Sequence, residues 1–188
     1  MNVKKMILAS TTAAILAVAP FAANAQKSDP TVGGAPMYPT KTIVENAVNS
    51  PIHTTLVAAV KAAGLVGTLN SKGPFTVFAP TNDAFAKLPE GTVDNLVKPE
   101  NKATLVKILT YHVVPGKISS EQLEKDIKKG HGKAELKSVQ GDELTFTEPT
   151  PGAITITDEK GGTANITTAD VFQSNGVIHV IDSVLMPN

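Results

Sequence analysis

The sequence lacks cysteine and arginine entirely, although it is 188 residues long and contains 17 basic side chains, all of them lysine. Without cysteine, the chain has no disulfide bond, no thiolate nucleophile and no thiolate metal ligand. Nucleic-acid and phosphate-ester sites depend on the planar guanidinium group of arginine and on an excess of basic residues. The 17 lysines are balanced by 17 acidic residues, so the chain has neither feature. We therefore expect no nucleic acid among its partners.

The first 25 residues have the pattern of a secretory signal peptide. Lys4 and Lys5 precede an apolar run over residues 6–20, and Ala23-Asn24-Ala25 is the small-x-small pattern that signal peptidase cleaves. No later stretch approaches the roughly 20 apolar residues that a membrane-spanning helix needs. We therefore expect an exported protein without a transmembrane segment, located in the periplasm, outside the cell or at the cell surface.

Residues 26–39 are rich in proline, glycine and small polar side chains. Such a segment buries too little apolar area to offset the entropy lost on ordering, so we predict a flexible tail there. Residues 40–188 remain, a length within the usual range for one domain with a real hydrophobic core. The expected organisation is thus a signal peptide over 1–25, a tail over 26–39 and one domain over 40–188.

The beginning of this domain carries start and stop signals for helices. Thr42 and Glu45 have the spacing of a capping box, in which two side chains satisfy backbone amides at a helix start. For the next helix we expect Ser50 as the N-cap, Pro51 at the first helical position and Gly64 as the left-handed residue past the end. A predicted buried stripe lies between them: Ile52, Leu56, Val60 and Ala63.

A strand is predicted over residues 75–79, which are rich in aromatic and β-branched side chains. The polar residues Thr81, Asn82 and Asp83 follow and are predicted to cap the next helix. A longer helix is expected to begin at Pro99, with an inner face of Leu105, Ile108, Leu109 and His112.

The pattern changes in the second half of the domain. Residues 144–147, 153–157 and 164–168 read as short strands separated by turns rich in glycine and proline. Residues 177–185 are apolar at nearly every position, as expected for a strand that is covered on both sides. Helices followed by strands predict the α+β fold class.

Three segments resemble the fasciclin, or FAS1, domain family. Residues 73–85 (GPFTVFAPTNDAF) are similar to its first signature segment, residues 175–187 (NGVIHVIDSVLMP) to its second, and residues 111–116 (YHVVPG) to its central Tyr-His segment. Their order and spacing match, and the resemblance extends from about Thr40 to the last residue. It implies a twisted, wedge-like antiparallel β-sandwich with several short helices packed on it.

The resemblance also implies a function in adhesion or protein interaction, with a cell-surface or matrix protein or polysaccharide as partner. In animal members the Tyr-His segment and an Asp-Ile pair before the second signature are implicated in receptor recognition. The matching positions are Tyr111 with His112 and Asp170 with Val171, where valine replaces the isoleucine. The residues themselves favour a structural role, because Val171 and His112 lie in apolar segments.

The remaining signature residues are interpreted as structural: Thr81, Asn82, Asp83, His179 and Asp182. No Gly-x-Ser-x-Gly elbow, His-Glu-x-x-His helix or phosphate-binding glycine loop occurs, so we expect a protein that is not an enzyme. We also expect no metal and no cofactor, because the histidines show no ligand spacing.

Two alternatives stay open. An apolar crevice between helices and sheet would suit a periplasmic carrier of a small apolar ligand such as a lipid. The lysine-rich residues 121–137 suit a solvated helix face, or a contact for an anionic polysaccharide or lipid headgroup.

Overall fold

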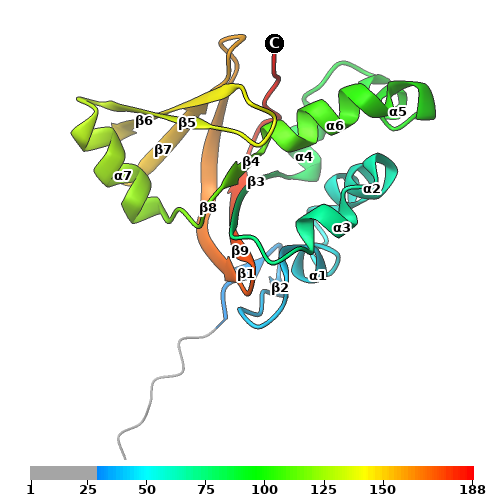
Figure 1. The fold of residues 1–188 in the computed structure, drawn as a ribbon, viewed down its shortest axis with the longest axis horizontal. Coiled ribbons are helices and arrows are strands. Elements are labelled where there is room, and N and C mark those ends of the chain that lie inside the picture. The colour runs from blue at the N-terminus through cyan, green and yellow to red at the C-terminus, as the bar shows by residue number, and fades with distance from the viewer. Residues whose placement is uncertain (1–28) are drawn as a thin grey trace, which may run out of the picture.

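The structure, a computed structural model, describes residues 29–188, so the predicted signal peptide lies outside the described residues. A seven-stranded sheet has the strand order β4-β3-β9-β8-β7-β6-β5, with helices on both sides of it (Figure 1). The strands of this sheet are β3 (Phe75–Pro80), β4 (Val113–Pro115), β5 (Lys133–Lys137), β6 (Glu143–Thr150), β7 (Ala153–Thr157), β8 (Thr163–Gln173) and β9 (Gly176–Ile181). The helices are α1 (Ile43–Ala47), α2 (Thr54–Ala63), α3 (Val66–Leu69), α4 (Asn82–Ala86), α5 (Thr92–Leu96), the 3-10 turn η1 (Pro99–Asn101), α6 (Lys102–Tyr111) and α7 (Ser120–Lys129).

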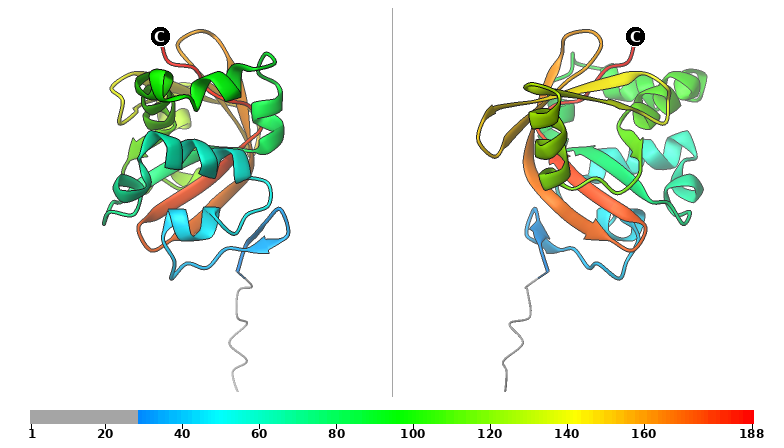
Figure 2. Two further views of the ribbon diagram at one scale, coloured as in Figure 1. Left: turned by 90° about the vertical axis from the view of Figure 1, so that its right-hand side faces the viewer. Right: turned by 60° about the vertical axis from the view of Figure 1, so that its left-hand side comes forward.

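The long strand β8 joins the two halves of the sheet. Its first residues pair with β7 and its later residues with β9, and the helices α1 to α6 lie on the side of β3 and β9 away from α7 (Figure 2). The predicted α+β class is confirmed. The expectation of a purely antiparallel sheet is wrong in one place, because β3 and β9 run parallel and the chain between them crosses over through helices and strands.

The alternation of side chains along β3 divides the core into two parts. Val77 and Ala79 pack with the helices α1, α2 and α6, whereas Phe78 points to the opposite face and packs beneath α7 and the β5–β8 strands. Successive residues of a strand point to opposite faces, so one strand supplies both parts. The parallel neighbour β9 is buried at all six positions, as predicted for a strand covered on both sides.

The predicted flexible tail is wrong for residues 29–39. β1 (Thr31–Val32) and β2 (Ala35–Pro36) form a short hairpin, and Val32 and Met37 are buried in the core on the side of the helices. The prediction rested on the average composition of the segment, which gave no weight to these two apolar residues. The hairpin turn places both of them against the domain. Residues of the segment predicted as a tail therefore belong to the folded part of the chain.

The capping signals are partly confirmed. Thr42 and Glu45 form the predicted capping box of α1, and Gly64 ends α2 with a positive φ of 76°, a conformation that favours glycine. The predicted N-cap is wrong for α2, which begins at Thr54 instead of Pro51. Ser50 is buried and its hydroxyl pairs with the Nδ1 atom of His53 at 2.8 Å, so it is not available to cap the helix.

Three of the lysines of α7 and β5 lie beside acidic partners. Lys125 pairs with Glu121 at 2.7 Å, Lys128 approaches Glu124 at 3.8 Å one helical turn away, and Lys133 pairs with Glu135 at 2.9 Å. Exposed pairs of this kind stabilise a fold weakly, by about 0.2–1 kcal/mol each. They do balance the local charge, which fits the interpretation of this helix face as solvated.

Candidate functional site

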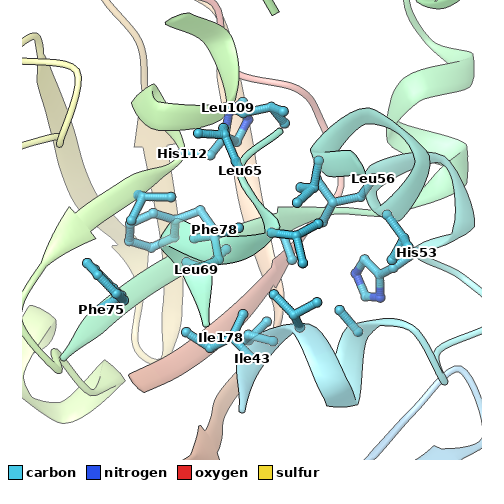
Figure 3. Close-up of a pocket in the computed structure, with 18 of the residues that line it drawn as sticks. Ile43, His53, Leu56, Leu65, Leu69, Phe75, Phe78, Leu109, His112 and Ile178 are labelled. Atoms are coloured by element: carbon cyan, nitrogen blue, oxygen red, sulfur yellow. The ribbon is translucent and has the colours of Figure 1, made fainter. Parts of the chain in front are cut away.

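An apolar cavity of about 220 Å³ lies between the helices α1, α2, α3 and α6 and the face of the sheet formed by β3 and β9 (Figure 3). Aliphatic side chains from all these elements form its wall, among them Ile43, Leu56, Leu69, Leu109 and Ile178. It reaches the surface, because its lining includes the exposed side chains of Val48 and Val139. Proteins bind small ligands in concave sites that are mainly apolar and carry a few polar groups.

His53 is the polar group of this wall whose hydrogen bonding is incomplete. The residue is only 3% exposed, and its ring lies beside the start of α2, away from His112 at the other end of the cavity (Figure 3). Its Nδ1 pairs with Ser50, but within residues 29–188 no group reaches Nε2 in hydrogen-bond geometry. Burial lowers the pKa of His53, and the nearby backbone of Ala79 only partly offsets this.

His112, predicted to be buried, is bonded through both ring nitrogens. The carbonyl oxygen of Ile108 lies 2.9 Å from Nδ1, and the amide of Leu185 donates to Nε2 at 3.0 Å. A carbonyl only accepts and an amide only donates, so the proton of the neutral ring is on Nδ1. Burial lowers the pKa of His112 to about 4, although the Ile108 carbonyl and the carboxylate of Asp158 act in the opposite direction.

His179 and Asp170 form one network at a β-bulge between β8 and β9. The bulge leaves the Asp170 amide without a strand partner, and this amide donates to His179 Nδ1 at 3.4 Å. His179 Nε2 then donates to the carbonyl of Ile118 at 2.9 Å, and burial lowers the pKa of His179. The Asp170 carboxylate accepts from the Ser120 amide at 2.8 Å and from its hydroxyl, so it caps the first turn of α7.

The structure places the candidate recognition residues mainly inside the protein. Tyr111, His112 and Val171 are buried, and Asp170 is half-buried. The Tyr111 hydroxyl donates to the carbonyl of Glu143 at 2.8 Å and accepts from the amide of Glu159, and burial raises the pKa of Tyr111 to about 12. Their role in recognition stays a prediction, and the contacts that they make are those of a scaffold.

The three polar residues after β3 have three different roles. Thr81 is the N-cap of α4, and its hydroxyl accepts from the Ala84 amide at 3.2 Å. The Asn82 side chain instead accepts from the amide of Thr55 at 3.0 Å, so it caps α2, whose own N-cap position is His53. The Asp83 side chain makes no hydrogen bond in the described part of the chain. Only Thr81 therefore has the predicted role in full.

We expect Asn82→Ala to lower the free energy of unfolding by about 1–2 kcal/mol, because it removes the cap of α2 and a further bond to the carbonyl of Pro51. Asp83→Ala is the matched control and is expected to change stability by less than about 0.5 kcal/mol, because Asp83 is exposed. Urea unfolding followed by circular dichroism measures both. Equal losses in the two variants would contradict the assignment.

Asp182 is bonded to groups of the same domain. Its two carboxylate oxygens accept from the backbone and side-chain amides of Asn165 at 2.8 and 3.0 Å, and Ser183 donates to it as well. Burial alone would raise the pKa of Asp182, but these hydrogen bonds together lower it. It joins the start of β8 to the end of β9.

Sequence reasoning missed two polar residues that connect distant parts of the chain. Asn175 accepts from the amide of Ile43 at 3.0 Å and donates to the carbonyls of Leu69 and Ser71 at 2.7 and 3.0 Å. Asp158 accepts from the amides of Gly162 and Met186, among others. Both are buried. Asn175 belongs to the second signature segment. The sequence could therefore have marked it as a candidate, but it did not indicate which groups it contacts.

Residues 29–188 were searched for a metal site and for a membrane-spanning helix. Among them, no three histidine, aspartate or glutamate side chains gather as a metal site would require. None of the helices in the same range is long and apolar enough to cross a membrane.

The fold and the cavity define an α+β module with a helical layer over a curled mixed sheet. The family model "Fasciclin domain" matches residues 51–187, and the chain belongs to this family. It is 54% identical to "Protein sll1483" of Synechocystis sp. over 146 residues, which are 78% of this chain and 73% of the relative. It is 37% identical to "Cell surface glycolipoprotein MPB83" of Mycobacterium bovis over 75% of this chain and 58% of that protein.

The fold is similar to that of a solved FAS1 domain pair from the insect cell adhesion molecule fasciclin I. The TM-score is 0.61 at 22% identity, and the match covers 79% of this chain and 51% of the insect chain. This confirms the fold that the three sequence segments implied.

Proposed function

We propose that the protein is an exported, non-enzymatic interaction module that attaches to a protein or polysaccharide of the cell surface or matrix. The main observation in support is that the polar side chains of the signature segments form hydrogen bonds within the domain. Those of Tyr111, His112, Asp170, His179 and Asp182 bond to groups of the same domain, so they support the scaffold and leave recognition to the outer surface. The insect neighbour is a cell adhesion molecule and one relative is named a cell-surface glycolipoprotein, and both agree with this proposal.

Attachment of cells tests the proposal. A strain without the protein is expected to attach less to its neighbours or to a matrix-coated surface, and purified protein containing residues 29–188 is expected to restore attachment. Heat-denatured protein serves as the negative control for addition of purified protein. Equal attachment with and without the protein would contradict the proposal.

The salt dependence of binding tests whether α7 contributes. The helix has as many acidic residues as lysines, so it carries little net charge, and we expect attachment to change less than about threefold between 50 and 500 mM NaCl. The measurement is a pull-down from the native cell envelope at the two salt concentrations. A loss of tenfold or more at high salt would instead indicate an anionic polysaccharide or lipid headgroup bound by lysines.

The cavity favours a second function, that of a carrier for a small apolar ligand. Its wall is almost entirely aliphatic or aromatic, and a cavity of about 220 Å³ is larger than an apolar cavity of about 150 Å³ that binds benzene. Native mass spectrometry of protein purified without detergent is expected to show a copurifying small molecule. Protein that is empty after this purification, and that binds no added apolar probe, would contradict a carrier function.

A further inference from the structure

We propose that the cavity between the helices and the sheet binds a single-chain fatty acid, with the alkyl chain inside the cavity and the carboxylate at its mouth beside the ammonium group of Lys61. The proposal rests on the carrier function proposed above and specifies its ligand. Two observations support it together: the volume and apolar wall of the cavity, and the sign of the charge on the residues that line it.

One opening of the cavity is marked by exposed residues of α1 and α2. Val57 and Lys61 lie one helical turn apart on α2, so they share one face of that helix. Both line the cavity, as do Val44 of α1 and Val48, which follows α1 and is 50% exposed. Lys61 is exposed too, and a lysine in such a place lays its methylene groups against apolar surface and keeps its ammonium group in water. The charged end of Lys61 therefore lies at the mouth.

This mouth carries a positive charge that is not balanced by a neighbour. No aspartate or glutamate of the described chain lines the cavity, and burial lowers the pKa of His53 and His112, so both rings are neutral at pH 7. The ion pairs within residues 29–188 are formed by other lysines: Lys87, Lys125, Lys128 and Lys133. The ammonium group of Lys61 has no carboxylate partner in this part of the chain. An anionic head group fits such a mouth, whereas a cationic one is repelled.

The volume sets the size of the bound chain. If benzene occupies an apolar cavity of about 150 Å³, then about 220 Å³ holds roughly nine carbon atoms at the same density. The alkyl chain of decanoate has this size, so it fills the cavity while its carboxylate stays at the mouth. The same volume is too small for the two chains of a phospholipid. Decan-1-ol and decylamine have the same carbon chain with a neutral and a positive head group, and they are the matched control ligands.

The experiment measures these ligands by calorimetry at pH 7.5 on purified protein containing residues 29–188. Decanoate is expected to bind the wild-type protein about fivefold more tightly than Lys61→Met, as an exposed ion pair of about 1 kcal/mol predicts. Decan-1-ol is expected to bind both proteins within about twofold, because methionine keeps the apolar stem. Lys61→Glu is expected to reverse the preference, so that decylamine binds more tightly than decanoate.

Two further variants separate a local charge effect from other causes. Lys129→Met removes the same charge from an exposed position on α7, across the sheet from the cavity, and is expected to leave decanoate binding within about twofold of wild type. Ala47→Phe places a ring in the cavity from α1 and is expected to abolish binding of decanoate and decan-1-ol alike. Binding that survives Ala47→Phe would place the ligand outside the cavity and overturn this proposal.

A second measurement needs only wild-type protein. In NMR spectra of the decanoate complex, the terminal methyl group is expected to show contacts to the buried side chains of Leu69 and Ile178 (Figure 3), and the methylene group next to the carboxylate to Val48. The reverse orientation, or equal effects of Lys61→Met and Lys129→Met, would refute the role of Lys61 while the carrier function stands. If none of the three ligands binds wild-type protein, the carrier function and this proposal both fail.

Discussion

Acidification from pH 7 to pH 4 is expected to lower the free energy of unfolding by about 3 kcal/mol or more. His112 accounts for most of this, because its pKa falls from 6.5 in the unfolded chain to about 4 in the buried site. Between these values the unfolded chain binds the proton and the folded protein does not. The contribution is therefore complete above about pH 6.5 and is lost as the pH falls toward 4. Burial lowers the pKa of His53 and His179 as well, so they act in the same direction.

Urea unfolding at intervals between pH 7.5 and 4 measures this effect. His131 is the matched control, because it is the exposed histidine on the turn after α7, and His131→Gln is expected to leave the slope unchanged. The lowered pKa values of Asp182, Glu45 and Glu121 act in a lower window, where carboxylates titrate, so a loss above about pH 5.5 belongs to the histidines. A stability that stays constant between pH 7 and 4.5 would contradict the neutral, buried state of these rings.

Asn175→Ala is expected to destabilise the protein by about 3 kcal/mol. The substitution removes three hydrogen bonds and leaves the amide of Ile43 and the carbonyls of Leu69 and Ser71 without their partner, and an unpaired buried group costs about 1–3 kcal/mol. Because Ile43 begins α1 and Leu69 ends α3, both helices lose their attachment to the turn before β9. Typical domains are stable by about 5–15 kcal/mol, so this is a large fraction.

Thermal and urea unfolding measure this prediction, with Asn49→Ala as the matched control. Asn49 lies in the turn after α1, is exposed and donates one hydrogen bond to the carbonyl of Glu45 in that helix, so its loss is expected to cost less than about 0.5 kcal/mol. For a domain of this size, about 3 kcal/mol corresponds to a decrease of roughly 6–12 °C in Tm. A decrease in Tm for Asn175→Ala no larger than that for Asn49→Ala would show that the three bonds are replaced by other contacts.

Local signals in the sequence predicted local structure well. The Thr42–Glu45 capping box and the Gly64 terminator are where their spacing placed them, because both depend on groups within one turn of the same helix. The apolar and β-branched patterns placed β8 and β9 correctly but not their ends, because β8 continues to Gln173 and β9 ends at Ile181. The error at Ser50 has the opposite origin, since Asn82 from another element supplies the cap that a local pattern assigned to Ser50.

The candidate site was predictable only in outline. The sequence left open an apolar crevice between helices and sheet, but the residues that line it come from elements spread over the whole domain, from β1 and α1 to β8 and β9. No pattern of neighbouring residues reveals which of these elements meet, because only the tertiary structure brings them together.

The sequence by itself determined the family, the α+β class and most helix and strand positions, because these depend on periodicity, caps and motifs along a short stretch of chain. Only the tertiary structure decided the roles of the polar residues: that Asp170 caps α7, that Asn82 caps α2, and that His112 is satisfied while His53 is not. The physical reason is that a buried polar atom needs a partner in space, and chain segments far apart in sequence provide it.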